Sequence, residues 1–553
     1  MISASSRATA LVGALVTGSL LLAATPASST PTTTSTTLAP PTTVTVSVPG
    51  NFTGCGYYDT STSALTRAVL DLIRPSAFVS NVAGIPVGAS GPIGQAELTS
   101  LTPQTVQYTV NPGFAWSNGQ PFTADDLEAW FAKVRSIPSA RTDGYRDIAS
   151  FTESADKSTV TAIFKTPFAD WNTLFRDIDF RGVPLRCSFA SFVDRPSLGP
   201  YEVLSVSRNA MTLVANPRWT GPAPGFTYVI LRSSLASLPS TSAVDFRNHV
   251  SAAFLTDVSS RPNTVGRLGP SDQIVSLGFS ATRPTTSSLA VRQFLGWALD
   301  RQSLINHEWG AVTYIPSLGG SSVFPQNSPY RQSPVGLGPF QQSSQSPLTT
   351  TPTSTSQDCT ECANDVLRSA GYVLRHGKWF TPAGSRLSVS LVVGPGVVND
   401  VAAQNVAQQW RVAGVRVHVA YAGTDQMAAG DLKKGHADAG IFTIVASGPP
   451  GQVVRSWTGT DYFDGYDTGW RSTQIDQWYA AAEDTYNPLD AVTNYELIDQ
   501  YINTQAWQRP LFTPPVFMTS TNDVGGVLLT SSLVGFVDQI PTWLTVANGS
   551  ATS

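Results

Sequence analysis

Ser154 and Lys157 have a spacing that could support covalent catalysis. In acyl-transfer enzymes with an S-x-x-K motif, the serine is the nucleophile and the lysine is its candidate base. The K-T-G and S-D-N motifs of those enzymes are absent, and residues 520–523 (Ser-Thr-Asn-Asp) are a poor substitute for the second. Ser154 also lies in a polar stretch before a β-branched run at 159–164, which indicates a turn ahead of a strand. We therefore predict no catalytic residue and interpret the protein as a non-enzyme.

Asp125 and Asp126 are neighbouring carboxylates that could act as a general acid and base. Thr123 stands three residues before Asp126, and this spacing forms a capping box at the start of a helix. Both negative charges also favour the positive end of the helix dipole. Apolar residues at 127, 130, 131 and 134 then recur at helical spacing. The pattern assigns the two carboxylates to helix capping rather than to catalysis.

The four cysteines, Cys55, Cys187, Cys359 and Cys362, could bind a metal, carry redox chemistry or form disulfides. A zinc site needs four well-spaced ligands, and the five histidines do not cluster near the cysteines. Cys359 and Cys362 form a C-x-x-C pair, but no thioredoxin-like unit surrounds it. An even number of cysteines in an exported chain usually indicates disulfides. We favour the pairs Cys55–Cys187 and Cys359–Cys362 among the alternatives, and expect no metal and no cofactor.

The N-terminus has the layout of a secretory signal peptide. Arg7 supplies a basic start, residues 10–24 are apolar, and small residues around Ala27 offer a cleavage site. The alternative is a retained N-terminal anchor. The first cysteine is Cys55, far beyond the cleavage site, so we expect no lipoprotein anchor. The mature protein is expected to be extracytoplasmic, in the periplasm, in the cell wall or secreted.

Composition limits the kinds of partner. A chain of 553 residues with 41% hydrophobic residues should fold into two or more domains. Charged residues make up 13%, the net charge is −4, and no basic block occurs, so a nucleic-acid partner is not expected. The Ser/Thr/Pro-rich residues 28–43 and 343–357 cannot bury enough apolar surface to fold alone. We predict a disordered tether and a surface insertion there.

The order of helices and strands indicates an α/β fold. A helical pattern over 400–413 ends at Gly414 and is followed by the alternating strand pattern 415–419. A second helix over 426–434 ends at Gly435 and precedes an apolar strand at 439–445. Helices that alternate with strands in this way form right-handed crossover units.

Motifs in five regions, in order along the chain, match those of one known family. They are W-S-N-G-Q-P-F-T-A-D-D-L at 116–127; G-P-Y at 199–201 with N-P-R-W at 216–219; V-R-Q-F-L-G-W-A-L-D-R at 291–301; L-R-S-A-G-Y at 367–372; and the C-terminal segments 474–477, 495–498 and 509–512. Together they resemble the family 5 extracellular solute-binding proteins, the peptide/nickel type, over roughly residues 45 to 540. The departures are small, with Asn118 for Asp and Leu127 for Val.

The resemblance implies a two-lobed periplasmic-binding-protein fold of the large cluster C type, with an extra subdomain on the first lobe. The expected division is a signal peptide at 1–27, a tether at 28–44, lobe I at 45–85 and 191–275, the extra subdomain at 86–190, lobe II at 276–505, and a return to lobe I at 506–545.

The resemblance also implies a ligand cleft between the lobes. By position in the family's order, the expected cleft residues are Tyr57, Tyr58, Gly278, Phe279, Ser280, Thr443, Val445, Ser447, Phe463, Tyr466 and Trp470. Aromatic rings suit such a site because they bury a large area at a low cost in side-chain entropy. The alternative for each residue is a place in the core.

The implied function is capture of a peptide-like or other small solute by hinge closure, for an ABC permease in the cytoplasmic membrane. We expect a monomer. A ligand sensor or wall-associated binding protein without transport is the alternative. Peptide-binding members often carry an acidic residue that pairs with the ligand's amine, but 444–451 contains none and the next carboxylate is Asp461. Because a buried amine without a partner is costly, ordinary short peptides are not the expected ligand.

Overall fold

The structure is a computed structural model of the whole chain. It describes residues 42–546 except 59–61, 82–84, 138–143, 185–188, 234–237, 249, 260, 311–317, 326–327, 329, 331–359, 447, 459–465 and 487. The expected signal peptide, nearly all of the expected tether and the insertion 343–357 lie outside these residues. The first strand begins at Thr43, inside the last residues expected to form the tether. Among the described residues, no helix combines the length and the apolar character needed to cross a membrane.

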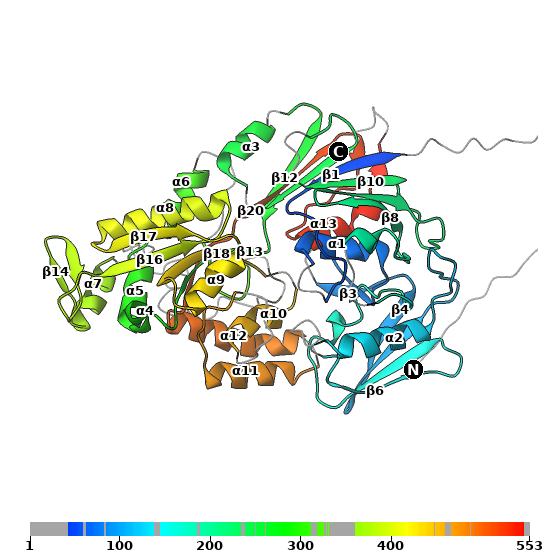
Figure 1. Cartoon of the computed structure of the whole chain (residues 1–553), viewed down its shortest axis with the longest axis horizontal. Helices are drawn as coiled ribbons and strands as arrows, with labels where there is room; N and C mark the ends of the chain where they lie inside the picture. Colours follow the sequence, from blue (N-terminus) through cyan, green and yellow to red (C-terminus); the bar gives the residue numbers. More distant parts are fainter. Residues whose placement is uncertain are drawn as a thin grey trace, which may run out of the picture. The chain divides into compact units, whose positions relative to one another are not determined.

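A seven-stranded sheet organises the described part of lobe I (Figure 1). Its strand order is β12-β20-β11-β1-β10-β9-β8, with bounds Thr264–Pro270, Pro515–Thr521, Ala243–Asn248, Thr43–Val48, Tyr228–Ser233, Ala210–Ala215 and Tyr201–Ser207. Helix α1 (Ala64–Ile73) packs on this lobe together with α13 (Leu533–Asp538). Ser63 caps α1 by accepting a bond from the Thr66 amide, and apolar residues at helical spacing form the buried face.

The extra subdomain contains a four-stranded sheet in the order β4-β5-β7-β6. The strands are Ile93–Leu101, Gln104–Val110, Thr159–Phe164 and Ile148–Glu153, and α2 (Ala124–Arg135) packs beside them. The predicted capping box is confirmed, since Asp126 accepts a bond of 3.0 Å from the Thr123 amide. The predicted turn between β6 and β7 is also present, and there Lys157 pairs with Asp125 at 2.6 Å. Ser154 instead donates to Asp156 at 2.6 Å, so these contacts do not join it to the lysine.

Lobe II is built on a five-stranded sheet in the order β17-β16-β18-β13-β19. These strands are Arg416–Tyr421, Ser388–Val393, Ala439–Val445, Gln273–Phe279 and Gln508–Phe512. Helix α8 (Val397–Val412) and helix α9 (Asp425–Lys433) lie on opposite faces, because their buried residues belong to different hydrophobic clusters. The predicted order of helix, glycine and strand is confirmed, and Gly414 and Gly435 both have a positive φ that glycine adopts at little cost.

The remaining elements surround these sheets. They are the helices α3 (Ala252–Ser259), α4 (Pro284–Ser287), α5 (Leu289–Trp297), α6 (Arg301–Trp309), α7 (Thr360–Ser369), α10 (Gly451–Val454), α11 (Thr473–Glu483) and α12 (Pro488–Thr504); the 3-10 turns η2 (Trp171–Thr173), η3 (Phe189–Phe192), η4 (Arg455–Trp457) and η5 (Ile540–Thr542); and the short strands β2 (Phe78–Ser80), β3 (Pro86–Gly88), β14 (Val373–Arg375), β15 (Lys378–Phe380), β21 (Val524–Gly525) and β22 (Leu544–Thr545).

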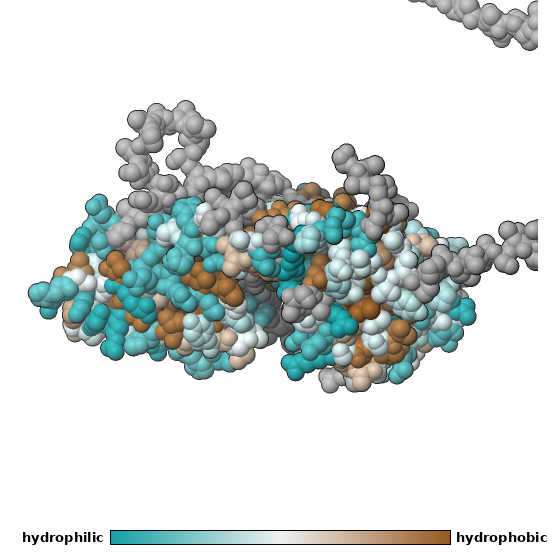
Figure 2. Space-filling view, turned by 90° about the horizontal axis from the view of Figure 1, so that it is seen from above, coloured by the Kyte–Doolittle hydropathy of each residue, from teal (hydrophilic) through white to brown (hydrophobic). Residues whose placement is uncertain are grey.

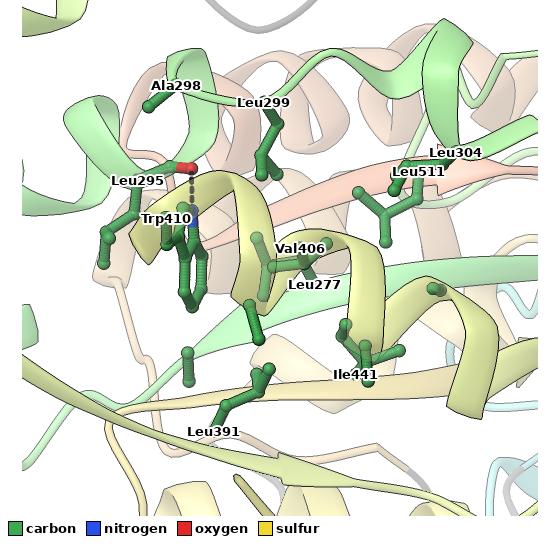
Figure 3. Close-up of a cluster of buried hydrophobic side chains, with 14 of the residues drawn as sticks. Leu277, Leu295, Ala298, Leu299, Leu304, Leu391, Val406, Trp410, Ile441 and Leu511 are labelled. Atoms are coloured by element: carbon green, nitrogen blue, oxygen red, sulfur yellow. Dashed lines mark hydrogen bonds between the residues drawn. The ribbon is translucent and has the colours of Figure 1, made fainter. Parts of the chain in front are cut away.

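The main core of lobe II lies between its sheet and the helices α5, α6 and α8 (Figure 3). Side chains such as Leu391 of β16 and Ile441 of β18 pack beneath α8. Trp410 of α8 is fully buried and donates its indole N–H to the Leu295 carbonyl of α5 at 2.8 Å. This bond fixes two helices of the same layer to each other.

The two described cysteines, Cys55 and Cys362, carry no free thiol. Cys55 is buried in lobe I. Cys187 and Cys359, which we favour as their partners, lie outside the described residues.

Candidate ligand-binding site

Two chain crossings connect the sheets of the two lobes. Strand β12 of lobe I continues into β13 of lobe II after Ser271 and Asp272, and β19 of lobe II continues into β20 of lobe I after Thr513 and Pro514. The crossings lie side by side, because β12 pairs with β20 and β13 pairs with β19. The Ser271 hydroxyl donates to the Pro514 carbonyl at 2.7 Å and joins the two crossings directly. Such paired strands form a hinge about which two rigid bodies can rotate.

The hinge lies a few residues from the expected lobe boundaries at 276 and 506. Strand β13 already belongs to the lobe II sheet from Gln273, and β19 stays in that sheet up to Phe512. The surface is hollowed between the two lobes (Figure 2). A solute bound there could contact both lobes, as hinge closure requires.

Tyr57 and Tyr58 lie between β1 and α1 in lobe I. Their rings meet edge to face with centroids 5.0 Å apart. Tyr58 is buried, and its hydroxyl donates to the Tyr145 hydroxyl at 2.9 Å. Burial, together with the neighbouring Tyr145, raises the pKa of Tyr58 well above its ordinary value. Tyr57 is half-buried. The structure thus leaves Tyr57 more accessible to a ligand than Tyr58.

Gly278, Phe279 and Ser280 lie at the end of β13 in the interior of lobe II. A Cβ on Gly278 would stand 2.9 Å from two ring atoms of Phe442, so the close packing of this strand requires glycine. Phe279 is fully buried in the main core. The buried Ser280 hydroxyl donates to the Leu432 carbonyl at 2.6 Å. These contacts serve the interior of lobe II.

Thr443 and Val445 belong to the neighbouring strand β18. The Thr443 hydroxyl is buried and donates to Asn399 at 2.9 Å, while its amide donates to the Asp425 carboxylate at 2.9 Å. Burial raises the pKa of Asp425 to about 6, against the lowering effect of the bonds from Thr443 and Asn399. Val445, the last residue of the strand, is 46% exposed. Val445 is therefore the residue of this pair that offers surface to a solute.

Two of the aromatic residues expected in the cleft, Tyr466 and Trp470, pack within lobe II. Tyr466 is nearly buried and stacks in parallel on Phe442, with centroids 5.9 Å apart. Trp470 is half-buried and stacks on Trp507 at 5.2 Å. The Arg292 guanidinium lies over the Trp470 ring, 4.3 Å from the ring centroid. Ser447 and Phe463 lie outside the described residues.

The lobes also meet away from the hinge. In the loop after β7, the Ala169 amide donates to the Glu483 carbonyl of α11 at 3.2 Å. The Trp171 indole donates to the Tyr486 carbonyl at 2.9 Å, and its ring meets Phe78 of lobe I edge to face. Sequence reasoning missed this contact, because 315 residues separate Trp171 from Tyr486 and no local pattern links them.

The chain matches the family described as bacterial extracellular solute-binding proteins, family 5 Middle, over residues 98–465. Among curated proteins, it is similar to the oligopeptide-binding protein OppA of Mycobacterium tuberculosis and of Mycobacterium bovis, with 29% identity over 196 residues. That match spans 32% of this chain and 32% of each relative, about a third of their length.

Solved structures of the same two-lobed kind cover most of the chain. The periplasmic EDTA-binding protein EppA aligns with a TM-score of 0.77 and 20% identity, over 91% of this chain and 96% of its own. The oligopeptide-binding protein AppA from Bacillus subtilis, in complex with a nonapeptide, aligns with a TM-score of 0.70 and 15% identity. That alignment covers 92% of this chain and 100% of AppA. NikZ from Campylobacter jejuni, in complex with Ni(L-His), aligns with a TM-score of 0.71 and 16% identity. That alignment covers 92% of this chain and 100% of NikZ.

These likenesses confirm the expected α/β two-lobed periplasmic-binding-protein fold. The family match, which covers more than half of the chain, confirms the resemblance found in the sequence motifs and indicates an extracytoplasmic protein. The chain belongs to the bacterial extracellular solute-binding proteins, family 5.

Proposed function

We propose that this protein captures a small solute between its two lobes and presents it to an ABC permease in the cytoplasmic membrane. The observation that carries the proposal is the pair of chain crossings at 271–272 and 513–514, which join the sheet of lobe I to the sheet of lobe II. A hinge of this kind lets a bound solute stabilise the closed form through contacts with both lobes. The protein acts as a monomeric binding protein, without catalysis, cofactor, metal or nucleic acid.

The exported state belongs to the same proposal. Residues 1–27 act as a cleaved signal peptide, and no lipid is attached. In the oxidising environment outside the cytoplasm, Cys55 pairs with Cys187 and Cys359 pairs with Cys362. Peptide mapping of the secreted protein under non-reducing conditions tests both the cleavage site and the two pairs.

The solute itself can be sought directly. Native mass spectrometry of the protein purified from its own host should show a mass shift from a co-purified small molecule. Denaturing the sample should abolish that shift and release the molecule unchanged. A protein that carries no solute from its host, and shows no closing with any fraction of host medium, would contradict the proposal.

Ordinary short peptides are a poor fit for the lobe II side of the cleft. Residues 444–451, at and after the end of β18, contain no carboxylate, and Asp425 is already engaged by Thr443 and Asn399. The amine of a bound peptide would then lose its hydration without gaining a charged partner. We expect no submicromolar binding in calorimetry with a library of di- to pentapeptides at low salt. Submicromolar binding would refute this part of the proposal.

The same binding protein could serve a sensor instead of an importer, since the first cysteine stands far beyond the expected cleavage site. Permease and ATPase genes beside its own would decide for transport. Their absence, with a neighbouring receptor gene, would favour sensing.

A further inference from the structure

The loop Phe168–Thr173 of the extra subdomain places one carboxyl group inside lobe II. Asp170, between the two residues that bond to lobe II, is only 3% exposed. Ala169 before it is fully buried and belongs to a hydrophobic cluster made otherwise of lobe II residues. The loop therefore buries both an apolar side chain, Ala169, and a carboxyl group, Asp170, against lobe II.

A glycine of lobe II, Gly451, lies next to the Asp170 carboxyl. A Cβ on Gly451 of α10 would stand 3.2 Å from Asp170 Oδ2, 3.0 Å from Glu483 Oε1 and 2.7 Å from the Tyr495 hydroxyl. Groups from three helices of lobe II and from the loop thus converge on one point. A Cβ would force the Tyr495 hydroxyl to shift, and the Glu483 and Asp170 carboxyls would each have to give by a few tenths of an ångström.

Several titratable groups surround Asp170. The titratable groups that act on it come from lobe II and are Glu483 and Tyr479 of α11, Tyr495 of α12, Arg455 of η4, and Tyr330. Tyr495 donates to Glu483 at 2.9 Å, and Arg455 donates to Tyr479 at 2.6 Å. Among the described residues, Asp170 Oδ1 has no hydrogen-bond partner. Burial, and then Glu483, raise the pKa of Asp170 well above its ordinary value, against the lowering effect of Arg455.

We propose that the loop Phe168–Thr173 is the latch that holds the two lobes closed, and that Asp170 is the residue that positions it against lobe II. The inference rests on the proposed hinge closure. When the lobes separate, the bonds from Ala169 and Trp171 break and the Asp170 carboxyl returns to water.

Closing the latch then takes up a proton. The carboxyl has an ordinary pKa of about 3.9 in the open form and a raised pKa in the closed form. The contribution of Asp170 to closure is fully present below the ordinary pKa. It is lost progressively as the pH rises toward and through the raised pKa. Within that window the ratio of closed to open protein falls by about tenfold per pH unit.

Small-angle scattering of the protein freed of solute tests the latch without any ligand. The wild type is compared with three variants between pH 4.5 and pH 8.5. Asp170→Asn keeps the shape of the side chain but cannot titrate, so its closed fraction should not change with pH. Gly451→Ala should lower the closed fraction at every pH, because its methyl group crowds the Asp170 carboxyl only when the loop contacts lobe II. Gly430→Ala in α9 is the matched control, because a Cβ there meets nothing within 4 Å, and it should follow the wild type.

The outcomes separate the latch from the proposed function. The wild type should open as the pH rises, and Asp170→Asn should not. If Asp170→Asn opens with the same pH dependence as the wild type, or if Gly451→Ala scatters like the wild type, the latch is refuted. Either result leaves solute capture to be judged by mass spectrometry. Absence of any bound solute, with the expected scattering, would refute the proposed function and leave the latch standing.

Discussion

Asp425 provides the sharpest test of the energetics inside lobe II. It lies in the first turn of α9, and its Oδ1 accepts one bond from the Thr443 amide and one from the Asn399 side chain, both 2.9 Å long. Burial of the charged form outweighs these bonds and raises the pKa of Asp425 to about 6. Because both bonds go to Oδ1, an asparagine with its amide oxygen in that place keeps both and removes the charge.

The size and sign of the expected change in stability follow from the linkage between proton binding and folding. A rise from the ordinary value of about 3.9 to about 6 corresponds to roughly 3 kcal/mol as an upper limit, because each pKa unit is worth about 1.4 kcal/mol. Since the pKa is raised by folding, the contribution of Asp425 to stability is fully present below about pH 4 and is lost as the pH rises through about 6. We expect Asp425→Asn to be more stable than the wild type by about 1–3 kcal/mol at pH 8, and about equal to it near pH 4.

Urea denaturation at pH 4.5, 6 and 8 measures this difference. Asp490→Asn is the control, because Asp490 also lies in the first turn of a helix, α12, but is exposed. Its effect should stay within about 0.5 kcal/mol at each pH. If Asp425→Asn were instead less stable than the wild type at pH 8, the ionised carboxylate would gain more from its two bonds than it loses by burial. That result would refute the reasoning.

Three further changes test packing and covalent links. Trp410→Phe removes the bond from the indole to the Leu295 carbonyl, and the free energy of unfolding should fall by about 1–3 kcal/mol in urea melts. Gly278→Ala drives a methyl group against the Phe442 ring and should destabilise lobe II by about 1–3 kcal/mol; a loss of solute binding with unchanged stability would show a ligand contact instead. Reduction of the disulfide proposed at Cys55 should lower the free energy of unfolding by about 2–4 kcal/mol, and an unchanged melting curve would contradict the pairing.

Local patterns in the sequence predict much of the fold because their causes are local. The Thr123 capping box begins a helix through contacts three residues apart. Gly414 and Gly435 end helices because they adopt a positive φ, and a strand follows each. The hinge at Ser271 is different, since it depends on pairing with a segment more than 240 residues away. No spacing within either segment indicates that pairing.

Local sequence patterns say even less about which residues of the candidate site face a ligand. Ser280 and Thr443 carry hydroxyls of the kind that bind solutes, and the family's order places them near the cleft. The structure gives each hydroxyl a partner within lobe II, at Leu432 and Asn399. A serine or threonine in a strand pattern looks the same in sequence whether its hydroxyl faces a ligand or a neighbouring element. Only the tertiary packing distinguishes these two roles.

The latch also changes what a solute must supply. A solute favours the closed form only by the difference between its affinities for the two forms. To shift the protein from mostly open to mostly closed, the solute must bind the closed form more tightly by roughly 5 kcal/mol. Bonds between the lobes reduce the binding energy that the solute must supply. Burying Asp170 beside Glu483 acts in the opposite sense, because it penalises closure above the ordinary carboxyl pKa. The contact and the penalty therefore act against each other, and a solute that binds the closed form better adds to the effect of the contact.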